Sequence, residues 1–146
     1  MNTSVLPQQS QARDFPMLWS TPPDSLRITI QDTAKGPVVE LTGYLDLATT
    51  PMLRAACTEV LRGSADQRVA ADLERVSFCD CTGMNTLLHI HRLAQKSDGW
   101  LRLCGAGATF HKVLRITGLA PMLRCYASAA DAFSDVAPGG RGASQP

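Results

Sequence analysis

One short segment combines residue types that can do chemistry with the start of a helix. Phe78-Cys79 ends an apolar stretch, and Asp80-Cys81-Thr82-Gly83 follows before a new helical pattern begins. The side chain of Asp80, Cys81 or Thr82 can accept a hydrogen bond from a free N–H group of that helix. The helix start also carries partial positive charge, so a hydroxyl here lies where a phosphate group is tolerated. Ordinary helix caps share these features, and the physics alone favours that plainer interpretation.

Cys81 adds a thiol to the same turn. A thiol at the start of a helix can react as a thiolate, which would make it a redox sensor or a nucleophile. Asp80 opposes thiolate formation, because a neighbouring negative charge disfavours a second one. We therefore expect Cys81 chiefly to be a small residue that fits a tight turn, with a redox switch as the alternative.

The other candidate ligands do not form a recognisable site. His89 and His91 are two residues apart on a predicted helix, so they point in different directions and cannot bind one ion from the same face. Cys79-x-Cys81 has no second pair of the kind that structural zinc sites use. Gly105-x-Gly107 lacks the remaining glycine of a dinucleotide-binding fingerprint. We therefore expect no metal, no cofactor and no enzymatic activity.

Composition narrows the class of protein further. The chain has 146 residues, 45% hydrophobic and 18% charged, which fits one globular domain. Its net charge is +1 and its arginines are scattered, whereas nucleic-acid-binding proteins concentrate basic side chains. No stretch is long and apolar enough to predict a membrane span, and no secretory signal is evident. An odd number of cysteines, five, then indicates reduced thiols in the cytoplasm. We expect neither a nucleic-acid nor a membrane partner.

The chain divides into three parts. Residues 1–23 are rich in Gln, Ser, Thr and Pro, and residues 137–146 in Gly and Pro, so both ends are predicted to be flexible. Residues 24–136 form the predicted domain. Alternating or continuous apolar runs predict strands at 26–30, 38–42, 69–73, 100–104 and 124–126. Helical spacing and start signals predict helices from Thr49-Thr50-Pro51 to Gly63, from Gly83 to Lys96, at 109–116 and at 128–136.

The predicted elements follow the order β-β-α-β-α-β-α-β-α. The first two strands are joined by the turn Lys35-Gly36-Pro37 and are expected to be antiparallel. Helices separate the later strands, which indicates a mostly parallel central sheet with helices packed on it. The predicted fold class is therefore α/β.

Four segments lie in the order and at about the spacing of the STAS domain family. Over residues 26–136 the chain resembles the standalone bacterial anti-sigma factor antagonists of that family. The resemblance implies a STAS-like fold and a regulatory binding protein. It also implies that the partner is an anti-sigma factor, often one with serine/threonine kinase activity. The matching segments are Gly43-Tyr44-Leu45-Asp46, Val69-Ala70-Ala71-Asp72-Leu73, Phe78-Cys79-Asp80-Cys81-Thr82-Gly83-Met84 and Gly118-Leu119.

The resemblance also assigns roles to single residues. In the family, the residue before the motif glycine is the phosphoacceptor, which implies Thr82 here. The unmodified protein would bind the anti-sigma factor and free the sigma factor. Phosphorylation would end the binding, because a phosphate adds about −1.5 to −2 charges at the interface. Asp80 would orient the hydroxyl or contact the kinase, and Asp46 matches a second acidic position near the phosphosite. The expected partner-binding residues are Asp46, Asp80, Cys81, Gly83 and Met84.

This chain departs from the family pattern at three positions. Tyr44 stands where glutamate is usual, which alters the segment that flanks the binding surface. Thr82 stands where serine is commonest; its branched side chain has fewer rotamers, but it can still be phosphorylated. Cys81 replaces a small hydroxyl residue. Two other functions stay open: a STAS-type binding scaffold without a phosphorylation cycle, and a redox switch at Cys81.

Overall fold

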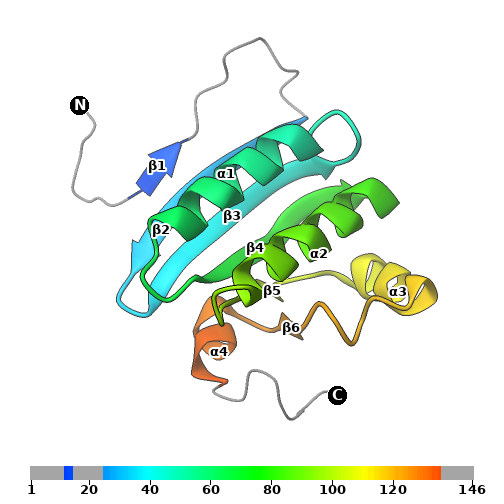
Figure 1. Ribbon diagram of the computed structural model, residues 1–146. Coiled ribbons are helices and arrows are strands. Elements are labelled where there is room, and N and C mark those ends of the chain that lie inside the picture. The colour runs from blue at the N-terminus through cyan, green and yellow to red at the C-terminus, as the bar shows by residue number, and fades with distance from the viewer. Residues whose placement is uncertain (1–11, 15–24, 136–146) are drawn as a thin grey trace.

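The computed structural model describes residues 12–14 and 25–135, in which strands and helices alternate (Figure 1). The strands are β1 (Ala12–Asp14), β2 (Leu26–Thr33), β3 (Gly36–Leu45), β4 (Arg68–Cys79), β5 (Trp100–Cys104) and β6 (Cys125–Tyr126). The helices are α1 (Thr50–Arg62), α2 (Cys81–Gln95), α3 (Ala108–Thr117) and α4 (Ala129–Ser134).

The described strands form one six-stranded sheet in the order β1-β2-β3-β4-β5-β6. β2 pairs antiparallel with β1 and with β3, whereas the pairs β3–β4, β4–β5 and β5–β6 are parallel. Each parallel pair needs a crossover connection, and α1, α2 and α3 supply the three. The mostly parallel α/β sheet predicted from the sequence is confirmed.

The main core lies between the sheet and the helices α1, α2 and α3. Alternate strand residues point toward these helices, as the period of two in β2 and β3 requires. Figure 1 shows α1 and α2 lying side by side across the sheet. Each helix buries the apolar residues that recur at helical spacing; in α1 these are Leu53, Ala56, Cys57, Val60 and Leu61.

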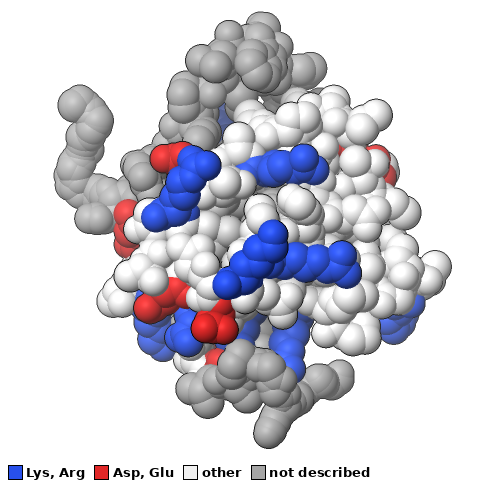
Figure 2. Space-filling view, in the orientation of Figure 1, with Lys and Arg blue, Asp and Glu red and all other residues white. Residues whose placement is uncertain are grey.

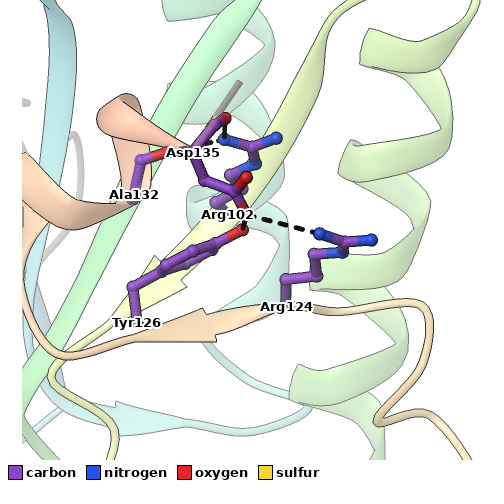
Figure 3. Close-up of polar contacts among 5 residues, drawn as sticks. All are labelled: Arg102, Arg124, Tyr126, Ala132 and Asp135. Carbon is purple, nitrogen blue, oxygen red and sulfur yellow. Dashed lines mark hydrogen bonds and ion pairs between the residues drawn. The ribbon is translucent and has the colours of Figure 1, made fainter. Parts of the chain in front are cut away.

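Helix α4 covers part of the opposite face, where Ala132 packs against Val38 and Ala70. Arg102 of β5 holds this short helix against the sheet, and its side chain is only 2% exposed. Its Nη1 donates to the carbonyl oxygens of Ala132 and Asp135, each at 2.6 Å (Figure 3). The last carbonyls of a helix lack partners within the helix, so a cation here satisfies them and complements the helix dipole.

Residues 12–14 differ from the expectation for the N-terminal segment. Residues 1–23 are predicted to be flexible, but Ala12–Asp14 form β1 and pair with 29–31 of β2. Their polar composition gives no strand signal, and the pairing depends on the free edge of β2. The remainder of 1–23 and the predicted tail 137–146 lie outside the described residues.

β4 and α2 also differ from their predicted bounds. The apolar runs 69–73 and 76–79 belong to one strand, although the polar pair Glu74-Arg75 separates them. Two register shifts against β3 each leave one extra residue in β4, so the strand continues past the polar pair as bulges. Helix α2 begins at Cys81, two residues before the predicted Gly83.

Candidate functional site

The ends of β3 and β4 position the candidate site. The two strands are parallel, and Leu45 lies opposite Cys79 in the last registered pair. Asp46 follows β3 and Asp80 follows β4, so both acidic residues emerge at the same edge of the sheet. The N–H of Asp80 donates to the carbonyl oxygen of Leu45 at 3.1 Å, which ties the two turns together.

Asp80 is the N-cap of α2. It has extended backbone angles, φ −95° and ψ −175°, and its Oδ1 accepts a hydrogen bond from the N–H of Gly83 at 3.0 Å. Its carbonyl accepts the first intrahelical bond, from Met84 N at 3.1 Å. Among the three capping candidates, the structure therefore selects Asp80. A carboxylate at this position is also favoured by the helix dipole.

Thr82 lies in the first turn of α2 and is half-buried, while its neighbour Cys81 is exposed. The carbonyl oxygen of Thr82 accepts a hydrogen bond from the Thr86 hydroxyl at 2.9 Å. The Thr82 hydroxyl itself has no hydrogen-bond partner within the described part of the chain. The predicted phosphoacceptor is thus held on a helix while its oxygen stays uncommitted.

Gly83 and Met84, which are predicted to bind the partner, are buried at the start of α2. A Cβ on Gly83 would lie 2.8 Å from both Cβ and O of Leu45 and 3.0 Å from the Cys79 sulfur. The end of β3 therefore packs closely against Gly83. Met84 is 0% exposed and packs in the main core. In this structure the two residues hold the start of α2 in place and present no side chain outward.

Asp46 shapes the loop between β3 and α1. Its Oδ1 accepts hydrogen bonds from the N–H groups of Ala48 and Thr49, at 3.0 and 3.1 Å. The Thr49 hydroxyl accepts from the N–H of Asp46 at 3.0 Å and donates to the Tyr44 carbonyl at 2.9 Å. Thr49 occupies the N-cap position of α1 as predicted, but its side chain braces the end of β3 instead of capping the helix.

Three exposed apolar side chains lie at the same end of β3 and β4, and we call them the apolar patch: Tyr44, Leu47 and Phe78. They are 40%, 74% and 49% exposed, respectively. The rings of Tyr44 and Phe78 have their centroids 5.7 Å apart, in a tilted arrangement. The sequence marks Tyr44 as a departure from the family pattern but does not pair it with Phe78, because only the parallel register of β3 and β4 brings the two side by side.

The five thiols are free, and they differ in environment. Burial, followed by the charges of Asp80 and Cys81, raises the pKa of Cys79 to about 12. Burial also raises the pKa of Cys57 and of Cys104 to about 12, and that of Cys125 to about 11. Cys81 is the one exposed thiol among them. A redox role for Cys81 stays a hypothesis.

In residues 12–14 and 25–135, no three His, Cys, Asp or Glu side chains lie so that they could hold a metal ion. None of the helices within these ranges has the length and apolar character needed to cross a bilayer.

The fold, together with the residues at the carboxyl ends of β3 and β4, defines a class of protein. Residues 26–132 match the family model of the STAS domain, so the chain belongs to the STAS domain family. It is 23% identical over 99 residues to the anti-sigma F factor antagonist of Paenibacillus polymyxa, which covers 68% of this chain and 85% of that protein. The predicted family membership is confirmed.

Solved structures agree with this assignment. An anti-sigma factor antagonist from Mycobacterium paratuberculosis superposes with a TM-score of 0.69 and 26% identity, over 80% of this chain and 98% of that one. The Bacillus cell fate determinant SpoIIAA in its phosphorylated form gives a TM-score of 0.57 and 25% identity, over 75% and 98%. Both the relative from Paenibacillus polymyxa and the structure from Mycobacterium paratuberculosis are anti-sigma factor antagonists.

Proposed function

We propose that this protein is an anti-sigma factor antagonist that binds its partner through the edge formed by the ends of β3 and β4, and that phosphorylation of Thr82 ends the binding. The observation that carries the proposal is the placement of Thr82. Its uncommitted hydroxyl lies in the first turn of α2, at the sheet edge where the apolar patch is exposed. The partner would be an anti-sigma factor with serine/threonine kinase activity.

The start of α2 can accept a phosphate without unfolding. The first N–H groups of a helix have no intrahelical acceptor. The Asp80 side chain accepts the N–H of Gly83, so the N–H groups of Cys81 and Thr82 are left to bind an anion. The helix dipole favours negative charge at this end. The added group therefore changes the surface while the fold beneath it stays as it is.

The apolar patch supplies contact area for a protein partner. Exposed aromatic side chains that lie together are typical of protein interfaces, where such residues contribute much of the binding energy. Tyr44 and Phe78 form such a pair, and Leu47 extends it along the loop after β3. Because Tyr44 departs from the family pattern, we assign it a part in partner choice.

Charge explains how phosphorylation would release the partner. Asp46 and Asp80 already place two carboxylates at this edge. A phosphate on Thr82 adds about −1.5 to −2 charges. The charge would lie within an interface with the partner that accommodates a neutral hydroxyl. Desolvating that charge at the interface disfavours the complex, and like-charge repulsion adds to the effect if the partner surface is acidic.

The proposal is tested by incubating the full chain with its cognate anti-sigma factor and ATP, followed by intact-mass measurement. We expect one added phosphate, which Thr82→Ala removes. Ser77→Ala is the matched control, because Ser77 is an exposed hydroxyl residue of β4 close in sequence to the site. Stoichiometric phosphorylation of the Thr82→Ala protein would show that the assigned site is wrong.

A further inference from the structure

A cavity of about 510 Å³ lies at the end of α2 that is remote from Thr82. In the part of the chain that the structure describes, β6 pairs only with residues 103 and 104 of β5, and no strand lies beside the first half of β5 on that side. The last turns of α2 and the segment before β6 line the space beside that edge. The volume is within the range of pockets that bind small organic ligands.

Three arginines are among the residues that line the cavity. Arg92, Arg102 and Arg124 line it, and Asp98 is the one acidic residue among the described residues that do. Arg102 is engaged with α4, and Arg124 lies 3.4 Å from Oδ2 of Asp135 (Figure 3). Figure 2 shows basic side chains gathered over α2 on this face, with acidic ones toward its margins.

Arg92 has no carboxylate partner in the described part of the chain. Its Nη2 contacts the Met122 sulfur at 3.9 Å, a weak acceptor, and the side chain is exposed. Arginine presents a planar fork of donors that matches the oxygens of a phosphate. The donors of Arg92 are therefore available to an anion in the cavity.

His91 supplies a second donor on the cavity wall. Its Nδ1 accepts a hydrogen bond from the N–H of Leu101 at 3.0 Å, so the neutral ring carries its proton on Nε2. Burial, together with the nearby Arg102, Arg92 and Arg124, lowers the pKa of His91. The ring therefore stays neutral near pH 7 and keeps Nε2–H as a donor of fixed orientation.

We propose that this cavity binds a small organic phosphate. The phosphate would be held by Arg92, Arg124 and the Nε2–H of His91, and the organic part would contact Leu88, Pro121 and Met122. The site is separate from the proposed phosphorylation switch, because Arg92 follows Thr82 by ten residues of α2, which corresponds to about 15 Å along the helix. Failure of one proposal leaves the other standing.

Phenyl phosphate is a minimal probe, since it joins one phosphate to one apolar ring. We would titrate it into the full chain labelled with ¹⁵N and follow the Leu101 amide resonance. Inorganic phosphate and phenol are titrated in parallel. We expect saturable shifts with phenyl phosphate, and weaker binding of the two fragments. Arg92→Gln should weaken the binding about tenfold, the effect of losing a charge-assisted hydrogen bond.

Arg62→Gln is the matched control. Arg62 is an exposed arginine in the last turn of α1, as Arg92 is in the last turn of α2, but it does not line the cavity. The control variant should bind like the wild type. The proposal is overturned if phenyl phosphate gives no saturable shift at millimolar concentration, if phenol binds equally well, or if Arg92→Gln and Arg62→Gln behave alike. Equal binding of inorganic phosphate would overturn the assignment to an organic ligand.

Discussion

At the scale of single residues, the candidate site depends on close packing beneath its surface. Asp80 fixes the start of α2 with one side-chain hydrogen bond, and Gly83 lets that start approach the end of β3. Cys81 is exposed in this turn, and Asp80 and Thr82 are half-buried. The Asp80 cap and the packing of Gly83 therefore hold the backbone of Thr82 in place, while its side chain stays partly accessible to solvent.

Gly83→Ala tests this packing. Alanine favours a helix over glycine by about 1 kcal/mol, but its Cβ would overlap Leu45 and the Cys79 sulfur. Overpacking of this kind costs about 1–3 kcal/mol, so we expect a net loss of stability in urea unfolding. Gly107→Ala is the control, because nothing lies within 4 Å of a Cβ there. Equal stability of the two variants would contradict the close approach.

At the scale of elements, His91 completes the edge of β5 where β6 does not reach. Its Nδ1 accepts the N–H of the buried Leu101, and protonation of that nitrogen would break the bond. The pKa of His91 is lowered in the folded chain, so the unfolded chain binds the proton more readily. Folding stability due to this group is full above its ordinary pKa of about 6.5 and falls as the pH drops below it.

Denaturant unfolding between pH 7.5 and 5 measures this effect. His91→Ala should lose about 1–3 kcal/mol at pH 7.5, because the Leu101 N–H loses its acceptor, and its stability should fall less between these pH values. His89→Ala should keep the pH dependence of the wild type, because His89 is exposed. The account is wrong if the His91 variant retains the full dependence.

Helix α4 has six residues and relies on side chains of the sheet for its position. Besides its bonds to α4, Arg102 lies 4.0 Å from the centre of the Trp100 ring, and the Tyr126 hydroxyl donates to Asp135 at 2.6 Å. We expect Arg102→Gln to lose about 2–3 kcal/mol and to speed hydrogen exchange of the α4 amides. Unchanged exchange there would show that apolar packing alone holds the helix. Arg115→Gln, at an exposed position of α3, is the control.

At the scale of the whole molecule, the features that the sequence predicts are those that depend on residues close together in the chain. The apolar stripe of α1, the alternation in β2 and the cap at Asp80 are properties of neighbouring residues, and each element forms close to its expected place. Pairing between distant segments was not predictable in the same way. The strand at 12–14, the bulges that make β4 continuous and the contact of Tyr44 with Phe78 all depend on register between strands.

The same distinction applies to the candidate site. The order of motifs identified the turn at 80–84 and the acidic residue at 46, and the parallel strands bring them to one edge. The motif did not indicate which of these residues face outward. Burial of Gly83 and Met84 follows from how α2 packs on the end of β3, which is a tertiary property.

The central claim is that charge at Thr82 controls binding to the anti-sigma factor. Calorimetric titration of that partner with Thr82→Ala and Thr82→Glu tests it most directly. His89→Glu controls for added charge, because it places a carboxylate at an exposed position two turns further along α2. We predict that Thr82→Ala and His89→Glu bind like the wild type, and that Thr82→Glu binds about 10- to 100-fold more weakly. Equal affinity of Thr82→Ala and Thr82→Glu would contradict the account.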